Sequence, residues 1–331
     1  MEWSRGIARN APTTFGYACA MRYLLLGNYG VGNLGDEMLR EYFLQAYPDV
    51  AWTVLSPQKG DLPRLPFGLR SLFTPWWKSL SALRKSEGII FGGGTLFTDI
   101  ESVKAPLLWG WHALWAWMFR KKIVLAFQGI GPFRTRVGEW CAQWVVKRAE
   151  AVIVRDRESL RRALAWNKNC IQSFDPVFSV FHKQKDNHRS QKLFIVIPRA
   201  NSPESFLQWV TELYGKRKGE WSGARIISLE PEAPGEKEVC EELKRSLDAE
   251  LIAPGSPTEL EHALADGSFV VTQRYHGAIA ALGMDIPFIA VPQSPGDKLA
   301  GIGSVHRDEA QKLLKEGEAA LRAALRSSFP F

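Results

Sequence analysis

The chain has 331 residues, of which 46% are hydrophobic, so it can bury two hydrophobic cores of ordinary size and we expect two domains. Lysine and arginine outnumber aspartate and glutamate by 42 to 35, and the net charge of +7 favours an anionic ligand. The basic residues are scattered and form no nucleic-acid-binding motif, which excludes nucleic acid as the expected partner. The four cysteines form neither a CxxC pair nor a disulfide framework, which predicts a cytoplasmic protein.

The first predicted strand begins at about Met21. Residues 1–20 lack the apolar run of a signal peptide, and we interpret them as an N-terminal extension or the product of an upstream start. After Met21, short apolar runs alternate with helical stretches. Buried parallel strands are predicted at RYLLLGN, VAWTVLS, GIIFGG, KIVLAFQGIG and AVIVRD. This alternation is typical of a doubly wound sheet, which we assign to a first domain over residues 21–182.

Polar residues interrupt this pattern around residues 179–192, which predicts an interdomain linker. Strands resume as LFIVIPR, ARIISLE, ELIAP, SFVVTQR and PFIAVP, so we predict a second domain over residues 190–304. Residues 305–331 are predicted to form a C-terminal helix. Two Rossmann-like α/β domains in this order predict a glycosyltransferase-B-like fold with the ligand cleft between the domains.

Glycine-rich turns follow the strands of the first domain. GNYGVGNLGD, residues 27–36, lies between a strand and a helix, where backbone N–H groups bind anions. The turn also fits the GxGxxG dinucleotide fingerprint, but the next strand lacks the acidic residue that binds the ribose, which argues against NAD. The alternative is that these glycines only permit tight turns. We predict acceptor-binding or phosphate-binding loops with the candidate residues Gly30, Gly32, Asn33, Gly35, Asp36, Gly93, Gly94, Asp99 and Gln128.

A cationic strand end is predicted in the second domain. TQRYHGAIAALG places Arg274 and His276 between a strand and a helix of small residues. Arginine binds phosphate or carboxylate with a planar fork, and histidine transfers protons near neutral pH. His276 alone is more often a structural residue, but its position beside Arg274 favours a role in the site. Arg199 and Lys298 also follow predicted strands, and each is either a cation of the cleft or an ordinary surface charge.

Residues 107–122 read LLWGWHALWAWMFRKK and are too short to cross a bilayer. The aromatic residues and the cationic end are typical of a helix on a lipid interface. Uniform apolarity instead favours a buried crossover helix that leads into the strand KIVLAFQ. We favour the buried helix and keep peripheral membrane contact as the alternative.

The chain resembles the polysaccharide pyruvyl transferases in six motifs: GNYGVGNLGDE, FGGGTLFTD, QGIGP, VIVRDRESL, FDPVFSV and QRYHGAIAALGMDIPFIAV. The resemblance covers most of residues 21–300 and is strongest to the CsaB-like branch, which pyruvylates cell-wall polysaccharide. It implies a glycosyltransferase-B-like fold, phosphoenolpyruvate as donor substrate, and a sugar or lipid-linked oligosaccharide as acceptor. Neither a metal nor a separate cofactor is expected, because the chemistry needs none.

The resemblance also assigns roles to residues. Arg274 and His276 fall on the family's RxH element, Lys298 on its loop lysine, and Arg199 on the arginine after the first strand of the second domain. We therefore predict Arg274 and His276 as catalytic, and all four residues as donor-binding. The implied reaction moves pyruvate onto a cell-wall or exopolysaccharide sugar as a cyclic ketal and releases phosphate. The implied location is the cytoplasm or the inner face of the cell membrane.

Two rival functions remain open on the same fold. One is a nucleotide-sugar-dependent glycosyltransferase, because Glu230 and Glu238 match a Glu-x7-Glu spacing found in such enzymes. The surrounding PEAPGEKEVCEELK is so acidic, however, that we interpret this pair as part of a solvated charged surface. The other rival is a non-catalytic protein that binds a sugar or an anion.

Overall fold

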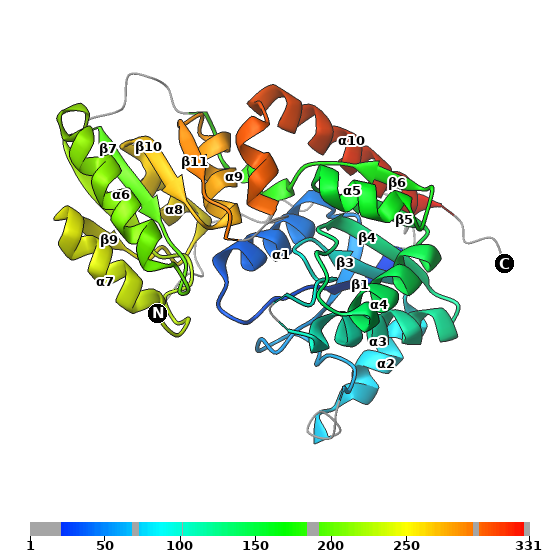
Figure 1. The fold of residues 1–331 in the computed structure, drawn as a ribbon. Helices are drawn as coiled ribbons and strands as arrows, with labels where there is room; N and C mark the ends of the chain where they lie inside the picture. The colour runs from blue at the N-terminus through cyan, green and yellow to red at the C-terminus, as the bar shows by residue number, and fades with distance from the viewer. Residues whose placement is uncertain (1–20, 68–72, 101, 184–191, 294–297, 328–331) are drawn as a thin grey trace, which may run out of the picture.

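The computed structural model describes residues 21–67, 73–100, 102–183, 192–293 and 298–327, so the predicted N-terminal extension lies outside the described residues. The described chain forms two α/β domains that lie side by side (Figure 1). Each domain is built on a parallel sheet, with the strand order β2-β1-β3-β4-β5-β6 in the first and β11-β10-β7-β8-β9 in the second. The fold is therefore the glycosyltransferase-B-like arrangement that the alternation of strands and helices predicts.

The first sheet follows the predicted apolar runs closely. Its strands are β1 (Met21–Leu26), β2 (Val50–Leu55), β3 (Gly88–Gly92), β4 (Lys122–Gln128), β5 (Ala151–Val154) and β6 (Cys170–Gln172). Strands β3 and β4 are buried along their whole length, because helices cover both faces of a parallel sheet. The edge strand β6 was not predicted, since its three residues are only partly buried or exposed and form no apolar run.

The second sheet also lies on the predicted runs. Its strands are β7 (Leu193–Ile197), β8 (Gly223–Ile227), β9 (Glu250–Ile252), β10 (Gly267–Thr272) and β11 (Phe288–Ala290). Strand β7 lies at the centre, pairs with β8 and β10, and is fully buried. The carboxyl ends of β7 and β10 therefore lie side by side, and the segments that follow them meet at one edge of the sheet.

Helices cover both faces of each sheet. On one face of the first sheet, α2 (Trp76–Lys85), α3 (Lys104–Met118), α4 (Arg136–Arg148) and α5 (Arg157–Leu164) share a hydrophobic core. The helix α1 (Leu34–Ala46) covers the other face. In the second domain, α6 (Glu204–Lys216) and α7 (Glu236–Leu247) pack on one face, and α8 (Pro257–Ala265) and α9 (Tyr275–Gly283) on the other.

The C-terminal helix α10 (Arg307–Arg326) returns to the first domain. Its buried residues Leu314, Leu321 and Leu325 belong to the same apolar cluster as α1 and α9. The Tyr23 hydroxyl on β1 donates a hydrogen bond of 3.0 Å to the Leu325 carbonyl oxygen. The chain thus crosses from the first domain to the second and back, and one apolar cluster extends through both domains.

Helix α3 is the crossover helix that leads into β4, as the favoured interpretation predicts. Its own residues Trp109, His112 and Ala113 are buried. The helix is not buried all round, however, because Trp117 and Met118 are exposed at its C-terminal end. Among the described residues, no helix is both long enough and apolar enough to cross a membrane.

Candidate functional site

A cavity of about 400 Å³ opens where the carboxyl ends of the two sheets face each other. The first domain contributes the N-terminus of α1 and the ends of β3 and β5, and the second contributes the segments after β7, β8 and β10. The side chains and glycines that matter here are Asn28, Asn33, Gly35, Asp36, Gly94, Thr95, Arg155, Arg199, Glu230, Gln273, Arg274, Tyr275, His276 and Lys298. Both halves of the predicted site therefore line one cavity.

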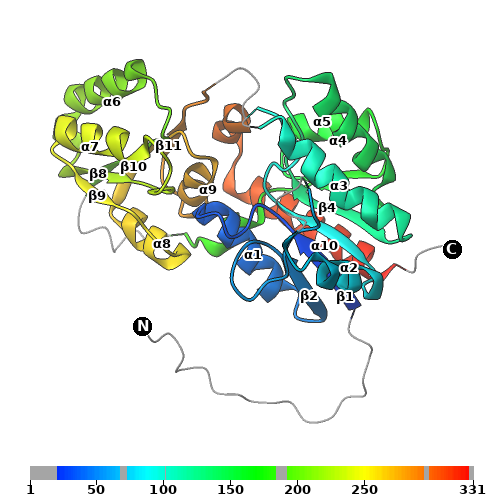
Figure 2. The same cartoon turned by 90° about the horizontal axis from the view of Figure 1, so that it is seen from below.

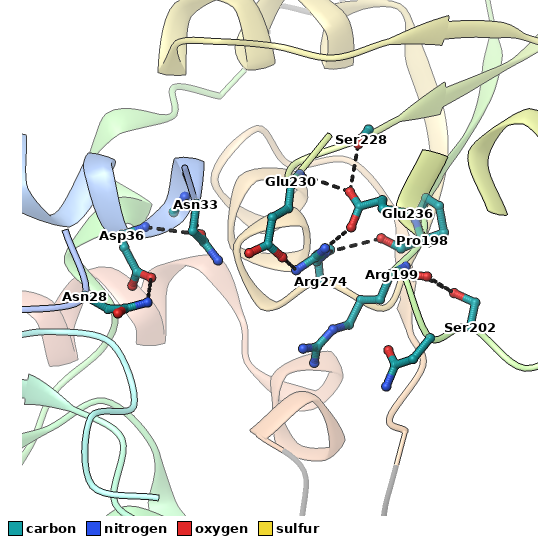
Figure 3. Close-up of polar contacts among 12 residues, drawn as sticks. Asn28, Asn33, Asp36, Pro198, Arg199, Ser202, Ser228, Glu230, Glu236 and Arg274 are labelled. Atoms are coloured by element: carbon teal, nitrogen blue, oxygen red, sulfur yellow. Dashed lines mark hydrogen bonds and ion pairs between the residues drawn. The ribbon is translucent and has the colours of Figure 1, made fainter. Parts of the chain in front are cut away.

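Asn33 begins helix α1 at the edge of this cleft. Its side-chain oxygen accepts hydrogen bonds from the backbone N–H groups of Gly35 at 3.0 Å and Asp36 at 3.4 Å. The Asn28 amide donates a 3.3 Å hydrogen bond to the Asp36 carboxyl (Figure 3). Two of the backbone N–H groups at the start of α1 are therefore already bonded to the capping side chain of Asn33.

The Asp36 carboxyl is almost completely buried. Burial raises its pKa to about 6, although the Asn28 hydrogen bond and the nearby cations oppose the rise. The charged or titratable groups that act on it are Tyr29, Glu37, Arg64, Arg155 and Lys298. A fraction of the Asp36 carboxyl groups therefore carries a proton near neutral pH, which makes this side chain a candidate proton donor.

Gly35 is the point at which the second domain contacts α1. A Cβ atom added to Gly35 would overlap the imidazole ring of His276, the second residue of α9. Only glycine lets the ring approach the α1 backbone this closely. Gly35 is predicted as a loop residue that binds a ligand; it lines the cavity and also contacts the candidate catalytic histidine.

His276 lies inside the cleft, but its charge state differs from the expectation. Its Nε2 atom is 3.8 Å from an Asp175 carboxylate oxygen and makes no hydrogen bond to a described residue. Burial lowers the pKa of His276 to about 3, against the attraction of Asp175. The imidazole is therefore neutral at physiological pH and is a poor proton donor. It remains able to donate one N–H to a ligand.

Arg274 also lies in the cleft, and two carboxylates occupy its planar fork (Figure 3). One guanidinium nitrogen is 2.7 Å from Glu230, another contacts Glu236, and Nε donates at 3.4 Å to the Pro198 carbonyl oxygen. Glu236 is completely buried and also accepts a 2.7 Å hydrogen bond from the Ser228 hydroxyl. The predicted open fork for an anionic ligand is thus already engaged by protein.

The two glutamates correct the interpretation of the acidic segment. Glu230 is only 30% exposed and faces the cleft, and Glu236 is buried, so neither belongs to a solvated surface. Glu238 lies on the exposed side of α7 and does not line the cavity. The Glu-x7-Glu spacing therefore does not form a carboxylate pair in the cleft.

The other two predicted cations line the same cavity. Figure 3 shows the Arg199 side chain extending from the second domain, with its guanidinium group below Arg274, and Arg199 lines the cavity. The Lys298 ammonium nitrogen lies 5.2 Å from the centre of the Tyr275 ring. Both residues are half-buried cations of the cleft and not ordinary surface charges.

A buried ion pair was not predicted. Arg155, at the end of β5, donates at 2.5 Å to Asp175 and at 2.7 Å to the Thr95 hydroxyl. Its guanidinium group also lies 4.3 Å from the Tyr275 ring centre in the second domain. Arg155 and Asp175 occur in two of the quoted motifs, VIVRDRESL and FDPVFSV. Their presence in these motifs is the sequence feature that could have indicated a role for them. Their pairing joins two segments 20 residues apart in the chain.

Five predicted loop residues do not line the cavity: Gly30, Gly32, Gly93, Asp99 and Gln128. Asp99 accepts hydrogen bonds from the backbone N–H groups of Arg134 and Thr135 at 2.5 and 2.8 Å, so it orders the loop before α4. Gln128 is completely buried and donates to the carbonyl oxygens of Phe91 and Gly93.

The three glycines of this group have positive φ angles, between +75° and +84°. Positive φ is a backbone region that favours glycine, so Gly30, Gly32 and Gly93 each permit a tight turn after a strand. Within the described ranges, no three or more histidine, cysteine, aspartate or glutamate residues are grouped so as to hold a metal ion.

Comparisons with known proteins identify both a family and a fold. A family model described as polysaccharide pyruvyl transferase matches residues 33–295. A search of curated proteins found no significant match. A putative UDP-N-acetylglucosamine 2-epimerase from Listeria monocytogenes is 13% identical, with a TM-score of 0.53 over 94% of this chain and 92% of that chain.

Two further solved structures show the same arrangement. The UDP-N-acetylglucosamine 2-epimerase from Rickettsia bellii is 11% identical, with a TM-score of 0.56 over 92% of this chain and 96% of that chain. The UDP-GlcNAc 2-epimerase from Neisseria meningitidis, bound to UDP-GlcNAc, is 12% identical, with a TM-score of 0.53 over 92% of each chain. At these identities the similarity shows the glycosyltransferase-B-like fold alone.

Proposed function

The chain belongs to the polysaccharide pyruvyl transferase family, and we propose that it transfers pyruvate from phosphoenolpyruvate to a cell-wall or exopolysaccharide sugar. The product is a cyclic ketal, and phosphate is released. The observation that carries this proposal is that Arg199 and Lys298, two half-buried cations, line one cavity together with Arg274. Phosphoenolpyruvate bears a phosphate and a carboxylate, and several cations around one cavity suit both groups.

Arg199 and Lys298 are the proposed primary donor-binding residues. Arg274 joins them only if the donor replaces one of its carboxylate partners. Glu230 is the partner to be displaced, because it is 30% exposed, whereas Glu236 is fully buried. With Glu236 still in place, Arg274 keeps one ion pair and turns the other side of its fork toward the donor.

The proton that starts the reaction is proposed to come from Asp36. The pKa of about 6 makes it a better acid near neutral pH than the neutral imidazole of His276. Its proton adds to the methylene carbon of phosphoenolpyruvate, and the adjacent carbon becomes an oxocarbenium-like centre. One sugar hydroxyl attacks that centre, a second hydroxyl displaces phosphate, and each hydroxyl loses its proton. The first hydroxyl proton returns to the Asp36 carboxylate, and the second leaves with the departing phosphate. His276 donates an N–H to a phosphate oxygen in this scheme.

The test is release of phosphate from phosphoenolpyruvate in the presence of acceptor sugars, with mass spectrometry of the pyruvylated product. We expect release to require the acceptor, and one deuterium to enter the product methyl group in deuterated water. Arg199→Ala and Lys298→Ala should each raise the KM for phosphoenolpyruvate by about tenfold or more, because each removes a charge-assisted hydrogen bond. Arg157→Ala, at an exposed ion pair with Glu309, is the matched control.

Other outcomes would support the rival functions. Turnover of a nucleotide sugar without turnover of phosphoenolpyruvate would favour the glycosyltransferase. Donor binding without turnover across a broad acceptor panel would favour a binding protein. Asp36→Asn with normal turnover would remove this residue from the proton-transfer role while leaving the pyruvyl transfer itself intact.

A further inference from the structure

The outer side of helix α4 is apolar where a surface helix is expected to be polar. Val137 and Trp140 are 55% and 62% exposed, and Trp144 follows one turn later and is half-buried. Their spacing of three and four residues aligns them in one stripe along the helix. The opposite side of α4 carries Ala142 and Val146, which pack in the core. The stripe is thus additional to the core-facing side.

The end of the neighbouring helix α3 continues this stripe. Trp117 is 51% exposed, and its ring centre lies 5.9 Å from that of Trp144 in an edge-to-face arrangement. Met118, the next residue, is also exposed. Figure 2 shows α3 and α4 side by side on the outside of the first domain. We call the surface made by Trp117, Met118, Val137, Trp140 and Trp144 the tryptophan patch.

Cations surround the tryptophan patch. The Arg148 guanidinium group lies 5.5 Å from the Trp117 ring centre and 4.1 Å from that of Trp144. Arg136 and Lys147 on α4 are exposed as well. Arg120 follows α3 and is likewise exposed, and Glu139 is the exposed acidic residue on α4. Positive charge beside exposed indole rings is the pattern that anionic lipid headgroups and the bilayer interface recognise.

We propose that the tryptophan patch binds the protein to the surface of a membrane that contains anionic lipids. Indole rings enter the interfacial region, where their apolar bodies contact acyl chains and their N–H groups stay hydrated. The arginine and lysine side chains extend to the phosphates of the headgroups. Apolar burial and charge attraction act together on this surface, which is the combination that reversible membrane binding requires.

The same helix connects the tryptophan patch to the cleft. Ala105 and Trp109, near the start of α3, line the cavity between the domains, and Trp117 lies near the end of the helix. At ~1.5 Å of rise per residue, Ala105 and Trp117 are about 18 Å apart along the helix axis. A membrane-bound protein therefore holds its cleft close to the bilayer. If pyruvyl transfer is the reaction, a lipid-linked acceptor can reach that cleft.

Flotation of the purified full-length protein with vesicles tests the proposal without any substrate. We expect binding to vesicles of phosphatidylcholine mixed with phosphatidylglycerol, weaker binding to phosphatidylcholine alone, and a loss of binding in high salt. The double variant Trp117→Ser and Trp140→Ser should lower the partition coefficient by about tenfold or more. Lys147→Glu with Arg148→Glu should lower it by about tenfold on the anionic vesicles. Trp209→Ser, at a 38% exposed tryptophan of the second domain, is the control and should bind normally.

Circular dichroism and thermal unfolding show whether each variant is folded, and the exposure of the altered side chains predicts that all of them are. Absence of wild-type binding to anionic vesicles would overturn the proposal. So would equal binding by the tryptophan variant and the wild type. A wild-type dimer that becomes monomeric in that variant, with no vesicle binding by either, would identify the surface as an interface between copies and would also overturn it.

Discussion

Gly35 and His276 belong to different domains, and their contact constrains both residues. The backbone of Gly35 is helical, and alanine is a better helix former than glycine, so only the overlap with the imidazole opposes Gly35→Ala. We expect this substitution to lower the free energy of unfolding by about 1 to 3 kcal/mol. Urea unfolding measures the change, and the cost should largely disappear in a His276→Ala background. Gly215→Ala, in an open helical position, should not destabilise the protein.

We expect the Asp36 carboxyl to lower the free energy of unfolding while it provides the proton for the proposed reaction. Because burial raises its pKa from the ordinary 3.8 to about 6, the folded state binds a proton more tightly than the unfolded state does. The resulting destabilisation is absent below about pH 4, grows as the pH rises, and is complete above about pH 6. We expect Asp36→Asn to raise the free energy of unfolding at about pH 8 by up to about 3 kcal/mol, and to abolish turnover.

Urea unfolding of wild type and Asp36→Asn at about pH 4 and about pH 8 measures this dependence. Glu37→Gln, which removes the neighbouring charge, is the control. A gain of the same size at both pH values would show that the stability change does not come from ionisation of Asp36.

At the scale of elements, the Arg155–Asp175 pair holds the end of β5 to the 3-10 helix Pro176–Val180, which leads toward the second domain. Both side chains are fully buried. Asp175→Asn keeps much of the side-chain shape but leaves the Arg155 charge uncompensated, so we expect a loss of about 3 to 5 kcal/mol in the free energy of unfolding. Arg155→Met combined with Asp175→Asn should recover part of that loss.

Chemical denaturation also provides the comparison for this pair. Glu158→Gln breaks an exposed ion pair with Arg161 and should cost less than about 1 kcal/mol. If Asp175→Asn falls within that small range, the buried pair does not contribute to stability in the way proposed.

At the scale of the whole molecule, α10 closes the structure by packing against the first domain after the chain has formed the second. At Gly317 the helix approaches the first domain closely, because an added Cβ atom would overlap the Ser173 hydroxyl near Phe127. We expect Gly317→Val to lower the thermal unfolding midpoint and to cost about 2 to 3 kcal/mol or more, because the helix must move away from the sheet. Gly219→Val, where nothing lies within 4 Å, is the control. Equal unfolding midpoints would show that α10 shifts without penalty.

The sequence was sufficient for every described strand except β6, for the two-sheet architecture and for the family, because those follow from local periodicity and from motif order. Buried parallel strands must be apolar runs, and the segments that follow them must meet at one edge of the sheet. Because Arg199, Arg274, His276 and Lys298 all follow such strands, the sequence predicts them on the second-domain side of the cleft.

Only the tertiary structure determines which residues of the site form ion pairs and which of its ionisable side chains are charged. Arg274 pairs with Glu236 and Arg155 with Asp175, 38 and 20 residues apart in the chain, and no local pattern records which segments approach each other. Burial sets the pKa of Asp36 and of His276, and it depends on how the two domains meet. The exposed side of α3 is likewise a consequence of packing, since a uniformly apolar helix carries no periodic signal for the face that the core leaves uncovered.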